Sequence, residues 1–176
     1  MLLALDVGNT EITAGLFHGA ELSAHWRLTT ATERTPDEWS VTLNALLVQA
    51  GHSPNEVRAT VMASVAPSVT QSLIAGVRSA TGSETIAVDS ATPLPIRLDV
   101  DEPLTVGADR IINTLAAVTL YQVDTLVVDF GTATTFDCIT GDGRFIGGVI
   151  NAGPSHLSGP AHPSRGQAPG NRADTA

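Results

Sequence analysis

Two short segments contain the residue types that a phosphate-binding turn needs. Residues 6–10 read Asp-Val-Gly-Asn-Thr and residues 129–132 read Asp-Phe-Gly-Thr, and each segment directly follows an apolar run. Glycine lets backbone amides approach a phosphate closely, threonine hydroxyls donate hydrogen bonds, and an aspartate can hold a cation or its hydration shell. The same residue types also favour ordinary hairpin turns, so either segment alone is ambiguous and only their repetition favours a function.

A third segment, residues 106–110, lies where a loop enters an expected helix. Amides at a helix N-terminus attract anions, Arg110 adds a forked donor, and the Asp109 carboxylate could take a proton from a hydroxyl. The competing interpretation is structural, because an aspartate in the first turn stabilises a helix in any protein and Arg110 could simply pair with it. The segment by itself leaves both interpretations open.

The composition restricts the chemistry further. The chain has 176 residues, of which 43% are hydrophobic and 15% charged, so a sizeable buried core is expected. All nine basic residues are arginine, which excludes a lysine-dependent phosphate loop or Schiff base. A net charge of -9 disfavours nucleic acid and membrane surfaces as partners. The single cysteine, Cys138, is expected in the core, and the absence of a targeting pattern predicts a cytoplasmic protein.

Residue periodicity predicts the elements that must position these segments. A helix is expected to start at Pro36, with a capping box formed by Thr35 and Glu38, and to end at Gly51. The other expected elements are strands over 2–5, 11–17, 21–29, 59–65 and 85–88, helices over 68–80 and 109–121, and a proline-containing connecting loop over 89–106. This alternation is typical of an α/β fold with parallel strands.

The chain then begins to repeat itself. Strands expected over 125–128, 134–139 and 144–150 follow the order of the first three, with Asp129 lying 123 residues after Asp6. Only 47 residues remain after Asp129, too few to repeat everything that followed the first copy. Residues 158–176 contain no Val, Ile, Leu, Met, Phe, Trp, Tyr or Cys, which predicts a disordered tail over 154–176 after a truncated or frame-shifted end.

Five ordered segments together resemble the type III pantothenate kinases, which belong to the superfamily of acetate and sugar kinases, heat-shock 70 proteins and actin. The segments are 6–10 with 15–17, 64–67, 107–110 with Asn113 and 116–117, 129–135 with Asp137, and 147–148 with Ile150. The resemblance implies an α/β fold of duplicated actin-like (ribonuclease H-like) lobes, a first over 1–122 and an incomplete second over 123–153. It also implies a homodimer that phosphorylates pantothenate with ATP at the start of coenzyme A synthesis.

Carried over position by position, the resemblance assigns roles to individual residues. The ATP phosphate loop would comprise Asp6, Val7, Gly8, Asn9, Thr10, Glu11, Ile12 and Thr13. Thr132 would contact the nucleotide from the second lobe, and Asp129 would hold a monovalent cation, K⁺ or NH₄⁺, with Mg²⁺ accompanying ATP. The pantothenate loop would comprise Gly107, Ala108, Asp109 and Arg110, with Asp109 as the general base.

The sequence also departs from the family pattern. Val100 stands where many members have a substrate-contacting tyrosine, and Ala152 replaces the proline of a Gly-Gly-x-Ile-x-Pro-Gly pattern. A substrate-contacting threonine of the second lobe has no counterpart in this sequence. The alternatives to an active kinase are therefore an inactive fragment of such an enzyme and a non-catalytic accessory or regulatory relative.

Overall fold

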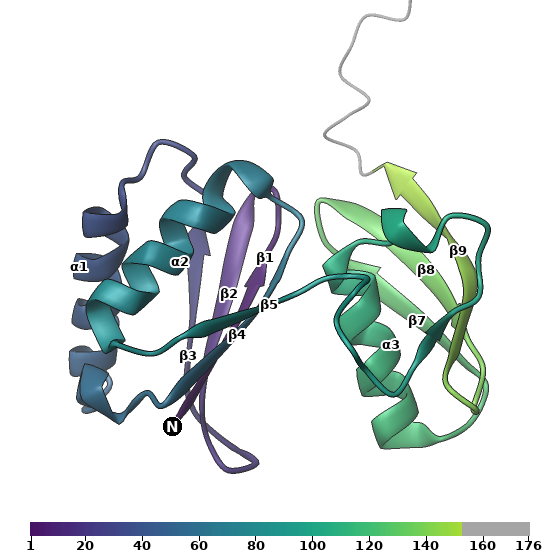
Figure 1. The fold of residues 1–176 in the computed structure, drawn as a ribbon, viewed down its shortest axis with the longest axis horizontal. Helices are drawn as coiled ribbons and strands as arrows, with labels where there is room; N and C mark the ends of the chain where they lie inside the picture. Colours follow the sequence, from purple (N-terminus) through teal and green to yellow (C-terminus); the bar gives the residue numbers. More distant parts are fainter. Residues whose placement is uncertain (153–176) are drawn as a thin grey trace, which may run out of the picture.

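The computed structural model describes residues 1–152 and forms four layers of helix and sheet. From left to right in Figure 1 lie a pair of helices, a five-stranded sheet, a third helix and a four-stranded sheet. The protein is therefore a mixed α/β protein with two sheets, as the sequence predicts. We call the five-stranded sheet with its helix pair the first lobe, and the four-stranded sheet the second-lobe sheet.

The sheet of the first lobe combines an antiparallel meander with two parallel strands. The meander consists of β1 (Leu2–Val7), β2 (Glu11–His18) and β3 (Glu21–Thr29), and the parallel strands are β4 (Ala59–Ser64) and β5 (Thr85–Val88). The spatial order β3-β2-β1-β4-β5 places β1 in the centre, as in a ribonuclease H-like lobe. All five predicted strands are confirmed, with ends that shift by no more than two residues.

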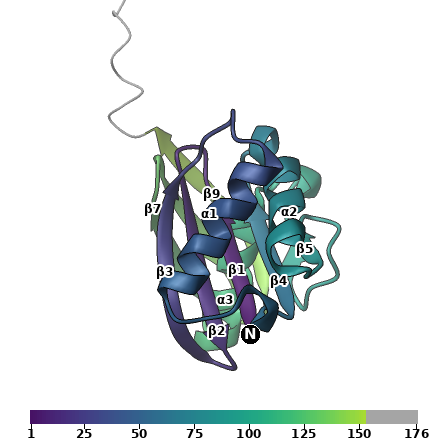
Figure 2. The same cartoon turned by 90° about the vertical axis from the view of Figure 1, so that its left-hand side faces the viewer.

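Helices α1 (Pro36–Gln49) and α2 (Pro67–Thr81) lie side by side on one face of this sheet (Figures 1 and 2). The predicted capping box starts α1: the Thr35 amide donates to Glu38 Oε2 at 2.7 Å, and the Glu38 amide donates to Thr35 Oγ1 at 3.3 Å. The helices and the sheet share one hydrophobic core. Among its fully buried members are Leu3 and Val7 of β1, Trp39 and Leu43 of α1, and Val69, Leu73 and Val77 of α2.

The second-lobe sheet repeats the opening meander. Its strands β7 (Thr125–Phe130), β8 (Ala133–Ile139) and β9 (Arg144–Ala152) are antiparallel neighbours, as predicted. Helix α3 (Ala108–Tyr121) covers the face that looks toward the first lobe (Figure 1). Ala117 of α3 packs there with Ile139 and Phe145, which are 2% and 1% exposed.

Two expectations from the sequence are wrong. The loop predicted over 89–106 contains strand β6 (Arg97–Leu98), which pairs with β9, and a 3-10 turn η2 (Pro103–Thr105). Prolines lie on both sides of this two-residue strand. It forms only because it pairs with β9, which is distant in the chain. Cys138 is exposed instead of buried, because alternation along β8 turns its neighbours Asp137 and Ile139 inward.

Two further expectations stay untested by the structure. The lobe boundary between 122 and 123 stays a prediction, since α3 contacts β4 of the first lobe as well as β7 and β8. The predicted disordered tail over 154–176 lies outside the described residues. Another turn of 3-10 helix, η1 (Pro54–Glu56), precedes β4, and among residues 1–152 no helix has the length and apolar composition needed to cross a bilayer.

The contact between α1 and α2 depends on Gly76, and this generates the first prediction. A β-carbon at Gly76 would lie 2.5 Å from the Trp39 β-carbon and 2.9 Å from the Pro36 carbonyl oxygen. We expect Gly76→Ala to destabilise the chain by about 1–3 kcal/mol through overpacking, measured by urea unfolding. Ser79→Ala on the exposed face of α2 is the control and should change stability little. Wild-type stability in the Gly76→Ala variant would contradict the tight helix contact.

Candidate active site between the two lobes

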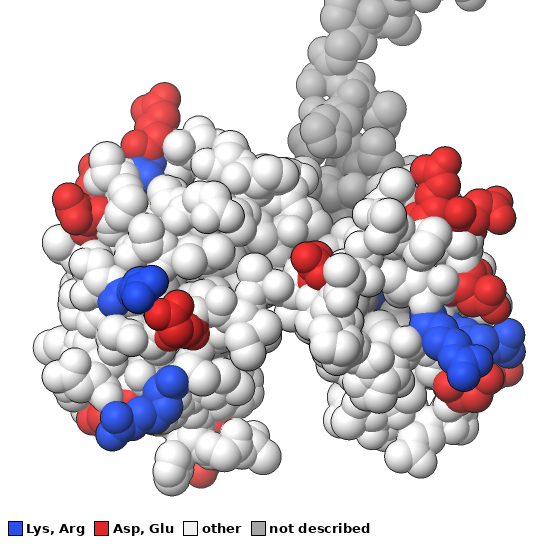
Figure 3. Space-filling view, in the orientation of Figure 1, with Lys and Arg blue, Asp and Glu red and all other residues white. Residues whose placement is uncertain are grey.

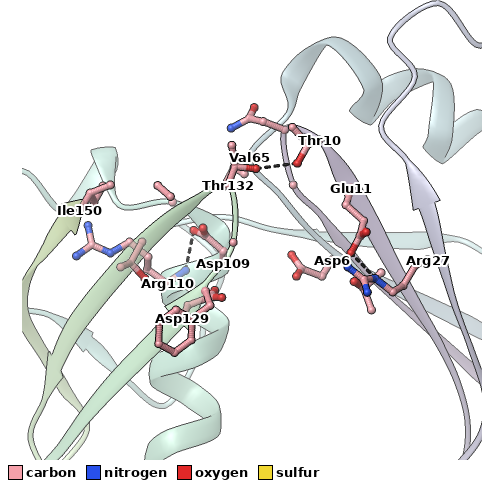
Figure 4. A pocket seen from close by; sticks show the side chains of 18 of the residues that line it. Asp6, Thr10, Glu11, Arg27, Val65, Asp109, Arg110, Asp129, Thr132 and Ile150 are labelled. Atoms are coloured by element: carbon pink, nitrogen blue, oxygen red, sulfur yellow. Dashed lines mark hydrogen bonds and ion pairs between the residues drawn. The ribbon is translucent and has the colours of Figure 1, made fainter. Parts of the chain in front are cut away.

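A cavity of about 740 Å³ lies where the predicted segments meet (Figure 4). The β1–β2 turn supplies one wall, the β7–β8 turn a second, and the N-terminus of α3 a third. The predicted site residues that line it are Asp6, Gly8, Asn9, Thr10, Glu11, Thr13, Gly107, Asp109, Arg110, Asp129 and Thr132. Segments more than 100 residues apart in the sequence therefore converge on one cavity.

Three residues of the predicted site do not line this cavity with their side chains. Val7 and Ile12 are both 0% exposed and belong to the core of the first lobe, and Ala108 is 6% exposed. Successive strand residues point to opposite faces of a sheet, so the neighbours of a cavity-facing residue turn into the core. Val7 and Ile12 can therefore offer a ligand only their backbone groups. The same holds for Ala108, whose side chain is buried at the start of helix α3.

The two turns that resemble each other in sequence face each other in space. Thr10 Oγ1 and Thr132 Oγ1 lie 2.7 Å apart, a hydrogen bond between the lobes that Figure 4 shows at the cavity rim. Each turn is closed by a glycine amide: Gly8 donates to the Glu11 carbonyl at 2.9 Å, and Gly131 donates to the Ala133 carbonyl at 3.0 Å. The cavity is thus bordered by one turn from each copy of the repeated segment.

Three carboxylates share this cavity, and their charges act on one another. Burial raises the pKa of Asp6 above its ordinary value, and the charges of Asp109 and Asp129 raise it further. Burial also raises the pKa of Asp109, opposed by the hydrogen bond that the Arg110 amide donates to Asp109 Oδ1 at 2.8 Å. Asp129 Oδ2 accepts a long hydrogen bond of 3.4 Å from Asn113. A cation between these groups would relieve their mutual repulsion.

The carboxylates do not form a closed metal centre by themselves. In the part of the chain that the structure describes, no three His, Cys, Asp or Glu side chains are placed to hold a metal ion together. One or two carboxylates per ion suit Mg²⁺, which keeps several waters and takes its remaining oxygen ligands from substrate phosphates. The donor set therefore fits a cation that arrives with a phosphorylated ligand.

The Arg110 guanidinium pairs with Asp137 and not with its neighbour Asp109, the partner that the structural interpretation of this segment allowed. Arg110 Nη2 and Nε lie 2.6 and 2.7 Å from Asp137 Oδ1, and the guanidinium stacks 4.9 Å from the centre of the Phe145 ring. Asp137 is 0% exposed. A β-carbon at Gly148 would collide with both Arg110 and Asp137, which explains a glycine on that strand. The pair ties the first turn of α3 to the second-lobe sheet.

Sequence reasoning missed several residues of the site. Arg27 lines the cavity and donates to Glu11 Oε1 at 2.6 Å, although its side chain is 71% exposed. Arg27 reaches the cavity because the β2–β3 register places it opposite Thr13. No local sequence pattern predicts this position. Thr135 and Ile150 line the cavity from β8 and β9, Val65 lines it from the loop after β4, and Thr105 lines it from η2. Val65, Thr135 and Ile150 lie in segments that carry the family resemblance, which was the signal available for them, whereas Thr105 lies in no such segment.

Two lobes that begin with the same strand, turn and strand, and that face each other across an acidic cavity, define a duplicated actin-like α/β protein. The family model of the type III pantothenate kinase matches residues 2–159 of this chain. The chain belongs to the type III pantothenate kinase family.

Curated relatives of the chain are also named type III pantothenate kinase. A type III pantothenate kinase from Thermomicrobium roseum is 46% identical over 153 residues, which cover 87% of this chain and 59% of the relative. Those from a Roseiflexus species and from Moorella thermoacetica are 42% and 43% identical, and the match covers 87% of this chain and 60% of each relative. The chain therefore spans about 60% of the length of the curated relatives it matches.

The crowded carboxylates generate a prediction about pH. The folded-state pKa of Asp109 is raised, so ionisation of its carboxyl lowers the free energy of unfolding. This stability is lost as the pH rises through the raised pKa. Asp109→Asn cannot ionise but keeps an acceptor oxygen for the Arg110 amide. We expect it to raise the melting temperature at pH 7 by about 1–3 °C, since partial solvation screens the charge.

The gain should shrink as the pH falls through the raised pKa of Asp109, because the wild-type carboxyl becomes protonated there. Melting curves of both proteins across this pH range, recorded without nucleotide, measure the effect. Asp101→Asn, which removes an exposed carboxylate outside the cavity, is the control. If Asp109→Asn raised the melting temperature equally at every pH, or lowered it at pH 7, the Asp109 charge would not destabilise the fold.

Proposed function

We propose that the complete protein transfers the terminal phosphoryl group of ATP to pantothenate and produces 4'-phosphopantothenate for coenzyme A biosynthesis. The observation that carries this proposal is the convergence of both turns and the α3 N-terminus, with three carboxylates, on one cavity. Membership of the type III pantothenate kinase family supports it. The proposal concerns a protein longer than this chain, because the relatives extend well beyond the matched residues.

The two turns are proposed to hold the phosphates of ATP. The turn residues Gly8, Asn9 and Thr10, together with Thr132 opposite, offer backbone amides and hydroxyls to phosphate oxygens. The sequence contains no lysine, so positive charge must come from arginine or from bound cations. Asp6 is suited to hold the hydrated Mg²⁺ of the nucleotide, and Asp129 to hold K⁺ or NH₄⁺. When bound, these cations neutralise charge on the phosphates.

Asp109 is proposed to act as the general base. Its carboxylate takes the proton of the pantothenate hydroxyl, the hydroxyl oxygen bonds to the terminal phosphorus, and the bond to the bridging oxygen breaks to release ADP. Its raised pKa supports this role, because a base works best when its pKa approaches the working pH. Gly107, Ala108 and Arg110 would form the pantothenate loop, and a β-carbon at Gly107 would lie 2.5 Å from Asp109 Oδ1.

The oligomeric state and the cellular location of the protein are also proposals. A homodimer is expected from the family resemblance, and a cytoplasmic location from the sequence. On the face drawn in Figure 3, basic side chains lie beside acidic ones. Ion pairs of this kind include those that Arg144 forms with Asp99 and Asp142. This mixing agrees with a small anionic substrate better than with a nucleic-acid backbone, which calls for clustered basic residues.

A chimeric protein tests the proposed reaction. Residues 1–152 would be joined to the part of the Thermomicrobium roseum relative that lies outside the match. We expect pantothenate-dependent release of ADP from the chimera, and little or none from the 176-residue chain. ADP release that does not depend on pantothenate, from a chimera that folds and binds ATP, would reject this substrate and favour a non-catalytic or differently specific relative.

In the active chimera, Asp109→Asn is expected to lower kcat by about 10²–10⁴-fold, because the amide cannot accept the hydroxyl proton. The dissociation constant of ATP should change much less. Steady-state rates with pantothenate and equilibrium titration with ATP measure the two effects, and Asp101→Asn is the control. Near-normal kcat in Asp109→Asn would remove Asp109 from the base role.

The absence of lysine generates a prediction about monovalent cations. Turnover should need K⁺ or NH₄⁺ in addition to Mg²⁺, and Asp129→Ala should abolish both this dependence and most of the activity. Rates in potassium, ammonium and sodium buffers of equal ionic strength measure it. Full activity in sodium alone would contradict a cation role for Asp129.

A further inference from the structure

Thr30, the residue that directly follows β3, holds the β1–β2 turn by its backbone. Thr30 Oγ1 donates to the Gly8 carbonyl at 2.7 Å, and the Thr30 amide donates to the Thr10 carbonyl at 3.0 Å. Gly8 and Thr10 line the cavity, whereas Thr30 is not among the described residues that do so. Thr30 therefore contacts the turn on the side away from the cavity, and it binds two carbonyl groups of the turn.

The Thr30 hydroxyl takes the place of an ordinary turn hydrogen bond. A tight hairpin turn is usually closed by a bond from the amide of its fourth residue to the carbonyl of its first. In this turn the first residue is Gly8 and the fourth is Glu11, and the reverse bond, from the Gly8 amide to the Glu11 carbonyl, forms at 2.9 Å. Among residues 1–152 the Glu11 amide does not donate to Gly8, whose carbonyl accepts from Thr30 instead. The turn is therefore closed on one side only.

The two carbonyl contacts also set the direction of two amides. The carbonyl and the amide hydrogen of one trans peptide group point in opposite directions. Because the Gly8 carbonyl points toward Thr30, the Asn9 amide in the same peptide group points to the cavity side of the turn. The Thr10 carbonyl, held by the Thr30 amide, directs the Glu11 amide away from β3 in the same way. Among residues 1–152 neither amide has a hydrogen-bond acceptor, so both can donate to an anion.

We propose that Thr30 is a positioning residue for the phosphate chain of ATP. Its hydroxyl competes with the Glu11 amide for the Gly8 carbonyl, so the turn stays open and its free amides can donate to phosphate oxygens. Thr30 touches no phosphate and acts only through the backbone of the turn. Thr30→Val keeps a similar shape without the hydroxyl, so the unpaired Gly8 carbonyl should turn to the Glu11 amide. The proposal rests on the proposed function of this turn in binding ATP.

Binding of inorganic tripolyphosphate with Mg²⁺ to the 176-residue chain tests the proposal. This probe presents the phosphate chain of ATP without its nucleoside. We expect Thr30→Val to weaken binding, measured by calorimetry, by about three- to tenfold, the effect of one lost hydrogen bond. Thr30→Ser keeps the hydroxyl and should bind within about twofold of the wild type. Thr32→Val, which removes an exposed hydroxyl from the loop between β3 and α1, is the matched control and should bind like the wild type.

Hydrogen exchange of the Glu11 amide, measured by NMR without ligand, separates this role from a merely structural one. The amide should exchange freely in the wild type and in Thr30→Ser, and several times more slowly in Thr30→Val, where it donates to the Gly8 carbonyl. Thr30→Val might only lower the melting temperature, with unchanged Glu11 exchange and unchanged tripolyphosphate affinity. That result would assign Thr30 an ordinary structural role and overturn the proposal.

The titration also separates failure of this proposal from failure of the proposed function. Equal tripolyphosphate affinity in the wild type and Thr30→Val would overturn the role of Thr30 and leave the phosphate site standing. Loss of affinity in Thr30→Ser as large as in Thr30→Val would also overturn it, because the hydroxyl would then not be the group that matters. Absence of tripolyphosphate binding in the wild type would reject the phosphate site itself, and the role of Thr30 with it.

Discussion

The alternation of side chains along two equivalent central strands is the constraint on which the rest of this structure depends. In β1 and again in β7, one aspartate points toward the space between the lobes while its neighbours point to the opposite face. A one-residue shift in either strand would bury the aspartate and expose the core. The same alternation of side chains therefore produces both the acidic cavity and the apolar faces. A change of register would remove both.

The pair formed by Arg110 and Asp137 transmits this constraint to α3. Asp137 is fully buried, and its partner is the second residue after the α3 N-terminal alanine, directly beside Asp109. Loss of one partner would leave the other charge unpaired in an apolar environment, which is strongly destabilising. The pair therefore fixes where the Asp109 carboxylate stands relative to β8. The position of the proposed base is set by an interaction with the second-lobe sheet as much as by its own helix.

Much of this arrangement could be predicted from the sequence, because local patterns determine it. The capping box at Thr35, the apolar spacing of α1 and the repeated turns all depend on residues close together in the chain, and the structure agrees with each. Strand β6 and the partner of Arg110 could not be predicted in this way. Both depend on pairing between residues 27 or more positions apart, which no local pattern encodes. Cys138 was misplaced because alternation gives the period of a strand but not which face is buried.

The apolar face of the second-lobe sheet that carries Leu126, Val128 and Phe130 meets the cavity at the end of β7. Phe130 directly follows Asp129, lines the cavity, and is 82% exposed, whereas its counterpart Val7 is fixed in the core next to the β1–β2 turn. The first turn is thus held by packing, while the second is held at the cavity rim by the hydrogen bond between Thr132 and Thr10. A helix layer over Phe130 would fix the second turn as Val7 fixes the first. Cover over this end of β7 would therefore preorganise the β7–β8 turn as well as bury apolar surface.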